Sequence, residues 1–367
     1  MRRAVFLVLT LLLAACQPPP PVKLGFIAGV SGRFADLGGV GRNGAQLAVE
    51  MRNQAGGING RKVELLVRDD QQDADTARAA VHDLAAQGVV AIVGPMTSVV
   101  GAAIAPTLNE SGLVAIAGTV TTTSLTGRDD NFFRVISTTR IYARNNALEC
   151  LRRFGAKRAS ILIDQANADY TESWMQDFKA AFEEKGGKIV SVIRFDSRQA
   201  KNFQQIASQA LSVKPDLIGL ASNATDAAML VQKLRQLNPD IAVTGGGWAA
   251  SERLLELGGR AVEGMLVEQY YNRHDQSDSY AQFLRAYRQR FGQDPGYAGV
   301  AGFDAANVAM EAIARGATRE TFKATLLRLR TFRGLQDEIR FDDFGDANRR
   351  LHMTLIDNGR FVPLERQ

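Results

Sequence analysis

The sequence predicts an α/β protein with two Rossmann-like lobes, each built around a parallel-rich sheet. Short β-branched runs alternate with amphipathic helical stretches along the chain, which is typical of parallel strands joined by helices. The strand candidates lack strict alternation of polar and apolar residues, as expected when helices cover both faces of a sheet. The 367 residues minus the first 22 leave about 345, too many for one typical core.

The first 22 residues predict export and a lipid anchor. Arg2 and Arg3 precede an apolar run over residues 4–13, which is too short to span a bilayer but suits a signal peptide. The following Leu-Ala-Ala-Cys resembles the bacterial lipobox, whose cysteine is acylated and becomes the mature N-terminus. We therefore expect a signal peptide over residues 1–15, lipidation at Cys16 and an extended, proline-rich tether over residues 16–22. Ordinary secretion, with Cys16 an incidental thiol, is the alternative.

The body then divides into two α/β series in chain order. The first alternates strands at 23–30, 63–69, 89–93 and 113–117 with helices at 44–54, 73–86 and 99–109. The second has helices at 143–154, 170–185, 203–211, 225–237 and 252–257, and strands at 159–163, 188–193, 216–220, 241–244 and 264–268. The closing segment has helices at 279–291, 299–314 and 319–330 and strands at 338–341, 352–357 and 361–364. Asn358-Gly359 between the last two strands predicts a tight hairpin.

Composition and motif spacing argue against several function classes. Removal of Arg2 and Arg3 lowers the formal charge from +5 to +3, and the remaining basic residues lie among acids, which argues against a nucleic-acid partner. The three histidines are far apart and no cysteine pair exists, so no metal or other cofactor is expected. Cys150 is expected in the core rather than as a nucleophile. No acid, base and nucleophile set emerges, so we expect no enzyme.

A glycine-rich stretch at residues 39–44 formally matches the dinucleotide fingerprint G-x-G-x-x-G. The motif requires a strand that turns directly into a helix, whereas about eight residues of expected loop follow the first strand here. We therefore expect these glycines to loosen the loop and to let the helix pack closely, not to bind a dinucleotide.

Hydroxyl-rich loops follow two neighbouring strands of the first lobe. Thr97-Ser98 precedes a helix, and residues 119–124 read Thr-Val-Thr-Thr-Thr-Ser. Ligands of open α/β sheets bind outside the carboxyl ends of the strands, and helix N-termini with hydroxyls favour anions. A carboxylate site is one interpretation; simple helix caps are the other.

Together these features resemble the periplasmic leucine/isoleucine/valine-binding proteins, the type I solute-binding proteins of ABC importers. The resemblance covers residues 23–363. It rests on the order and spacing of short markers, among them Asn-Gly-Ala-Gln-Leu-Ala at 43–48, Gly-Gly-Ile-Asn-Gly-Arg at 56–61, Ile-Val-Gly-Pro at 92–95 and Phe-Asp-Ala at 303–305. It implies three crossings between the lobes, near residues 134–138, 268–272 and 333–337. The first lobe would then hold residues 23–136 and 270–335, and the second residues 137–269 and 336–367.

The same resemblance implies the ligand-binding residues. Ser98 and Thr121 match the positions that hold a ligand carboxylate, with the Val120 backbone beside Thr121. Tyr170 loosely matches a tyrosine of the second lobe, and Asn223 and Trp248 lie in later post-strand loops of that lobe. The family holds the ligand ammonium with an acid at the position of Gly247, and this chain has none there. Trp248 instead offers a flat apolar face, which favours an aromatic or other uncharged ligand body.

The resemblance implies an exported, lipid-anchored binding protein of the cell envelope. Its expected partners are a small ligand (an amino acid or an aromatic or aliphatic carboxylate), an ABC permease, and the membrane through the N-terminal lipid. The rival hypothesis is a ligand-sensing or assembly lipoprotein that uses the same fold without transport, because a fold alone does not decide function.

Overall fold

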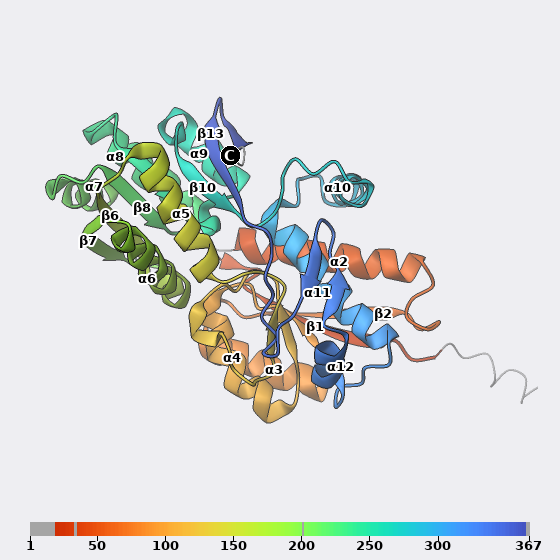
Figure 1. The fold of residues 1–367 in the computed structure, drawn as a ribbon. Coiled ribbons are helices and arrows are strands. Elements are labelled where there is room, and N and C mark those ends of the chain that lie inside the picture. Colours follow the sequence, from red (N-terminus) through yellow and green to blue (C-terminus); the bar gives the residue numbers. More distant parts are fainter. Residues whose placement is uncertain (1–18, 33–34, 200–201, 365–367) are drawn as a thin grey trace, which may run out of the picture.

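The computed structural model describes residues 19–32, 35–199 and 202–364. Cys16 and the expected signal peptide lie outside the described residues. The chain forms two α/β lobes that lie side by side (Figure 1). The prediction of two lobes with parallel-rich sheets is confirmed, and the lobes are joined by three crossings of the chain.

The first lobe is built on a five-stranded parallel sheet in the order β2-β1-β3-β4-β5. One apolar cluster lies between this sheet and helices α2, α10, α11 and α12, and another lies under α3 and α4. The elements of this lobe are β1 (Val22–Ala28), α2 (Ala35–Gln54), β2 (Val63–Asp69), α3 (Ala74–Ala86), β3 (Ile92–Val93), α4 (Ser98–Ser111), β4 (Ala115–Ala117), η2 (Thr123–Leu125), β5 (Phe132–Arg134), α10 (Asp278–Phe291), α11 (Gly296–Ala314), α12 (Phe322–Leu329), β11 (Thr331–Arg333) and β12 (Glu338–Arg340).

The second lobe holds a seven-stranded sheet in the order β14-β13-β10-β9-β8-β6-β7. Its core is again split, with α7, α8 and α9 on one face and α5 and α6 on the other. Its elements are α5 (Thr139–Phe154), β6 (Arg158–Asp164), η3 (Gln165–Asn167), α6 (Ala168–Glu184), β7 (Lys188–Phe195), α7 (Phe203–Ser212), β8 (Leu217–Ala221), α8 (Ala224–Leu237), β9 (Ala242–Gly245), η4 (Gly247–Ala249), α9 (Glu252–Gly258), η5 (Gly259–Val262), β10 (Leu266–Gln269), β13 (His352–Asp357) and β14 (Arg360–Pro363).

The glycine-rich stretch at 39–44 lies inside helix α2, which begins at Ala35 rather than at residue 44. The expected loop was therefore wrong, but the expected close packing is confirmed. A Cβ on Gly44 would lie 2.0 Å from the Gly299 carbonyl oxygen of α11, and a Cβ on Gly302 would lie 2.1 Å from the Gly41 oxygen. Burial against α11 therefore outweighs the helix propensity that each glycine lacks, about 1 kcal/mol.

The third crossing also differs from the expected one. Residues 338–347 stay with the first lobe, because β12 pairs with β11 and Phe341 packs in that lobe's core. The Phe341 ring lies edge-on to Phe133 at 5.3 Å between centroids. The chain therefore crosses between the lobes at residues 348–351, not at 333–337. The prediction that residues 336–347 belong to the second lobe was wrong.

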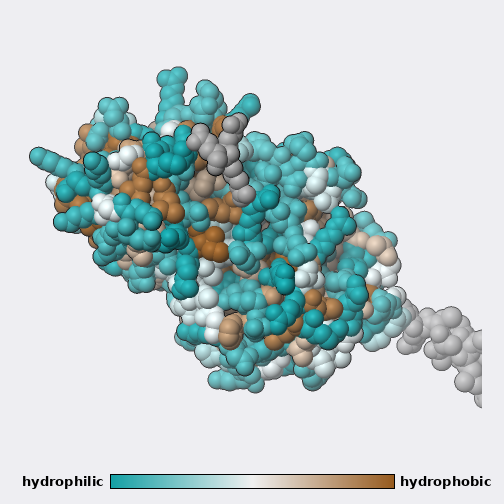
Figure 2. All heavy atoms as spheres, in the orientation of Figure 1, coloured by the Kyte–Doolittle hydropathy of each residue, from teal (hydrophilic) through white to brown (hydrophobic). Residues whose placement is uncertain are grey.

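The molecular surface is largely hydrophilic on the face that Figure 2 shows, with apolar atoms in separate patches. No helix of the described ranges has the length and apolar character needed to cross a bilayer. Cys150 is fully buried in the second lobe, as expected, and burial raises the pKa of its thiol.

Candidate functional site

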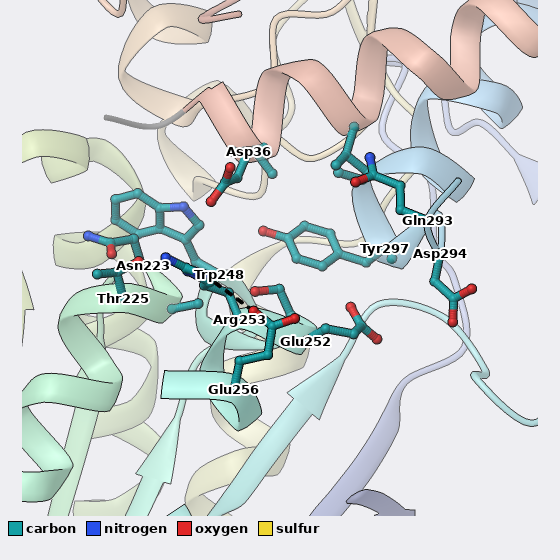
Figure 3. Close-up of a pocket in the computed structure, with 16 residues that line it drawn as sticks. Asp36, Asn223, Thr225, Trp248, Glu252, Arg253, Glu256, Gln293, Asp294 and Tyr297 are labelled. Carbon is teal, nitrogen blue, oxygen red and sulfur yellow. Dashed lines mark hydrogen bonds and ion pairs between the residues drawn. The ribbon is translucent and has the colours of Figure 1, made fainter. Parts of the chain in front are cut away.

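An outer cleft of about 570 Å³ opens between the two lobes. Its walls come from the N-terminal ends of α2, α8 and α11 and from the segment that contains η4 and α9 (Figure 3). The lining residues are Asp36, Leu37, Val40, Asn223, Ala224, Thr225, Trp248, Ser251, Glu252, Arg253, Glu256, Gln293, Asp294, Gly296, Tyr297 and Ala298.

The outer cleft carries four acids, but three of them are paired with arginines. Arg253 lies 3.3 Å from Glu256, and Glu252 and Asp294 pair with Arg273 and Arg288. Exposed salt bridges such as Arg253–Glu256 are weak, yet all three pairs reduce the negative potential of the rim. The acids of the rim therefore do not form a cation-binding site.

An inner cavity of about 10 Å³ lies next to the outer cleft, large enough for about one water molecule. It is lined by Leu37, Met96, Thr119, Asn167, Tyr170, Trp248, Tyr270 and Tyr297. Leu37, Trp248 and Tyr297 line both spaces and so separate them. Leu37 also packs against the cores of both lobes, which places the partition at the closed lobe interface.

The carboxyl ends of β3 and β4 bring Ser98 and Thr121 together. Ser98 Oγ accepts from the amides of Thr121 and Thr122, at 3.3 and 3.4 Å between heavy atoms. Arg134 fixes the same loop from beneath, because its guanidinium donates to the Thr122 carbonyl at 2.7 Å and to that of Val120 at 3.4 Å. Ser98 and Arg134, both buried, therefore fix the backbone of the loop on which the sequence predicts an anion site.

Two buried hydroxyls, those of Thr97 and Thr121, have no hydrogen-bond partner among the described residues. The two residues are 4% and 1% exposed. Buried polar groups are almost always satisfied, so such exceptions call for an explanation. Both hydroxyls belong to the first lobe, beside the start of α4 and after β4, and neither residue lines the outer cleft or the inner cavity. Tyr170, whose hydroxyl lies beside Tyr270, comes from α6 of the second lobe and lines the inner cavity.

Two glycines of the second lobe make room for tyrosines. A Cβ on Gly246 would lie 2.2 Å from Tyr170 Oη, and a Cβ on Gly247 would lie 2.2 Å from Tyr270 Cζ. Tyr270 therefore fills the space that a side chain at position 247 would need. Trp248 follows directly, and its ring meets Tyr170 edge-on at 5.9 Å between centroids.

A buried carboxylate, Glu268, lies behind this loop. Its oxygens accept from the Gly247 amide at 2.8 Å, from Trp174 Nε1 at 3.2 Å and from Asn146 Nδ2 at 3.4 Å. Burial raises the pKa of Glu268 to about 7, against the lowering effect of these donors. Glu268 is fully buried, and its bond to the Gly247 amide holds the backbone of the loop.

The structure places the sequence-predicted residues unequally. Ser98, Val120 and Thr121 are buried in the first lobe and line neither space, Tyr170 lines the inner cavity, and Trp248 lines both spaces. Asn223 lines the outer cleft, but its side chain is held within its own lobe, where it bonds to the Asp226 amide and carboxylate at 3.0 Å each.

Sequence reasoning missed several residues of the site. Leu37 and Asn167 follow the predicted strands at 23–30 and 159–163, so a signal for them existed. The sequence gives no such signal for three other residues: Tyr270 lies in a crossing between the lobes, Tyr297 at the start of a helix, and Glu268 in an apolar strand. Among the described residues no group of three or more His, Cys, Asp or Glu side chains could hold a metal ion.

Comparison with known proteins places this architecture. The chain is 27% identical over 248 residues to "Leu/Ile/Val-binding protein homolog 3" of Brucella melitensis; the alignment covers 67% of this chain and 66% of that protein, slightly less than two thirds of its length. The branched-chain amino acid transporter substrate binding protein of Streptococcus pneumoniae, solved with isoleucine, superposes with a TM-score of 0.85 at 22% identity over 94% of this chain and 99% of that one.

A third similar structure is the ABC transporter solute binding protein of Rhodopseudomonas palustris, solved with 3,4-dihydroxy benzoic acid. It superposes with a TM-score of 0.83 at 20% identity over 94% of this chain and 96% of that one. The two structures share the fold with this chain, although their bound ligands differ in kind. The profile of the family "Periplasmic binding protein" matches residues 21–360, which is 340 of the 367 residues. This chain therefore belongs to the periplasmic binding protein family.

Proposed function

We propose that this chain is an extracytoplasmic solute-binding protein, not an enzyme, that captures a small carboxylate between its lobes for delivery to an ABC importer. The names of its relatives support the transport role, and the two ligand kinds seen in similar structures share a carboxylate. The lipid anchor at Cys16 is part of this proposal and would tether the protein beside its permease.

The observation that carries the proposal is a set of buried hydroxyls near the lobe interface. Thr121 Oγ1 and Thr97 Oγ1 come from the two hydroxyl loops and have no partner among the described residues, and Tyr170 Oη comes from the opposite lobe. A ligand carboxylate accepts hydrogen bonds only, so three hydroxyls able to donate suit it. The ligand body would then extend into the outer cleft past Trp248 and Tyr297, two aromatic faces that suit an apolar group.

A thermal-shift screen of the full chain in mild detergent tests the proposal. The panel holds isoleucine, leucine, benzoate, 3,4-dihydroxybenzoate and short aliphatic acids. A ligand at 100 times its Kd adds about 2.7 kcal/mol of stability, enough to raise the melting temperature by a few degrees. A flat response across the panel would contradict the carboxylate assignment.

The variant Thr121→Val then tests the site itself. It removes one donor to a charged group, worth about 1.5–3 kcal/mol, so affinity measured by calorimetry should fall by about 10- to 100-fold. The melting temperature without ligand should hold, because the lost hydroxyl has no partner in the protein. Ser160→Ala is the matched control: Ser160 Oγ is equally buried and partnerless, but lies in β6 away from the cleft, so affinity should not change.

A further inference from the structure

Asn167 joins the two lobes at the inner cavity. It ends η3 and precedes α6 of the second lobe, and its side chain is 4% exposed. Its Oδ1 accepts from the amide of Val99, in the first turn of α4 in the other lobe, at 3.1 Å. The same side chain lines the inner cavity.

The bond to Val99 fixes the orientation of the amide group. A backbone N–H can only donate, so the oxygen of Asn167 must face α4 and the nitrogen must face away from it. No described residue accepts a hydrogen bond from Asn167 Nδ2. The remaining polar atom of this buried side chain is therefore an N–H₂ donor at a cavity that also has the Tyr170 side chain in its wall.

We infer that Asn167 is a ligand-binding residue with two tasks: its carbonyl caps α4 across the lobe interface, and its Nδ2 donates to the ligand carboxylate. The inference rests on the proposed function and adds a contact from the second lobe. It also assigns a cause of selectivity. A carboxylate can accept from Nδ2 with either oxygen, whereas a carboxamide can accept only with its carbonyl oxygen and must then turn its own N–H₂ donor toward the other groups of the site.

The substitution Asn167→Asp separates the two tasks. An aspartate keeps an oxygen for the Val99 amide, and an anion is favourable at a helix N-terminus, so the cap survives. The second oxygen replaces the donor with an acceptor. It repels a ligand carboxylate and accepts from a ligand carboxamide, so the variant should exchange one preference for the other.

A second bond between the lobes offers a matched control. Ser173 Oγ, on α6, accepts from the Thr123 amide at 3.0 Å. Ser173 lines neither the inner cavity nor the outer cleft. The variant Ser173→Ala therefore weakens the closed lobe interface without altering any group offered to the ligand.

The experiment measures the affinities of the full chain, in mild detergent, for leucine and leucinamide and for benzoate and benzamide by calorimetry. In Asn167→Asp, affinity for the acid that the wild type binds should fall about 100-fold, while affinity for its amide holds or rises, so that the amide is preferred. The melting temperature without ligand should hold. Ser173→Ala should weaken acid and amide by one common factor.

Two outcomes would overturn the inference. If Asn167→Asp weakens acid and amide equally, as expected for Ser173→Ala, Asn167 only joins the lobes. If the variant keeps the wild-type preference for the acid, Nδ2 does not face the carboxylate. A wild type that binds neither acid would instead refute the proposed function, and the inference would fall with it.

Discussion

The buried carboxylate of Glu268 should make the stability of the protein depend on pH in a way that one substitution removes. Burial raises the pKa of Glu268 from 4.5 to about 7. Between these values the unfolded chain has lost the proton that the folded chain still holds, so unfolding releases a proton and stability falls as pH rises. One pKa unit corresponds to about 1.4 kcal/mol, so Glu268 should cost about 3 kcal/mol above pH ~7 and nothing below pH ~4.

Glu268→Gln mimics the protonated side chain and cannot titrate. The glutamine amide would face Asn146 Nδ2, a donor, across the contact that is now 3.4 Å, and this clash shifts the stability of the variant by a constant amount at every pH. That constant does not change with pH. The difference in the free energy of unfolding between variant and wild type should therefore rise by about 3 kcal/mol, in favour of the variant, between pH ~4.5 and ~8.

Urea unfolding followed by tryptophan fluorescence suits this measurement. Trp174 and Trp248 are the two tryptophans of the chain, and both lie in the second lobe with Glu268. Trp174 also donates to Glu268 directly. Glu256→Gln, on the exposed face of α9, controls for the loss of a surface carboxylate. A difference that stays flat from pH 5 to 8 would refute a titrating, buried Glu268.

Two further predictions concern the packing that builds the site. Gly44→Ala would place a Cβ 2.0 Å from the Gly299 carbonyl oxygen and should destabilise the first lobe by about 1–3 kcal/mol in urea unfolding. Gly39→Ala, with open space around its Cβ, should instead stabilise α2 by up to about 1 kcal/mol. Arg134→Met leaves the partly buried Asp346 without its partner at 2.6 Å and should cost about 3 kcal/mol, part of which Asp346→Asn in the same chain should restore. Equal effects of the two glycine variants, or a neutral Arg134→Met, would contradict these readings.

Much of the fold could be predicted because each element carries its own local signal. The hairpin of β13 and β14 is an example: its turn residues Asn358 and Gly359 have φ values of 50° and 67°, which these two residue types tolerate well. Helix α2 shows the limit of such reasoning. Its glycines read as a loop by propensity, but contact with α11, which the sequence alone does not reveal, makes them helical.

The residues of the candidate site likewise fall into those that a local sequence pattern predicts and those that only tertiary contacts bring together. Ser98 and Thr121 could be placed together because parallel strands end at one edge of a sheet. Asn167 and Val99 meet across 68 residues of chain and across the lobe interface, so no local pattern predicts the contact. The same holds for Tyr270 and Gly247, whose contact depends on how the second crossing enters the lobe.

The polar groups of the site fall into two sets with different roles. One set is satisfied within the protein and fixes the backbone, as when Arg134 holds the Thr122 carbonyl and Glu268 holds the Gly247 amide. The other set, which includes the hydroxyls of Thr97 and Thr121, is buried without partners among the described residues. A buried group left unpaired costs about 1–3 kcal/mol. A ligand that accepts hydrogen bonds at the lobe interface would relieve that cost, and only a closed arrangement of the lobes brings donors from both sides to it. Ligand selectivity and lobe closure would then have the same physical cause.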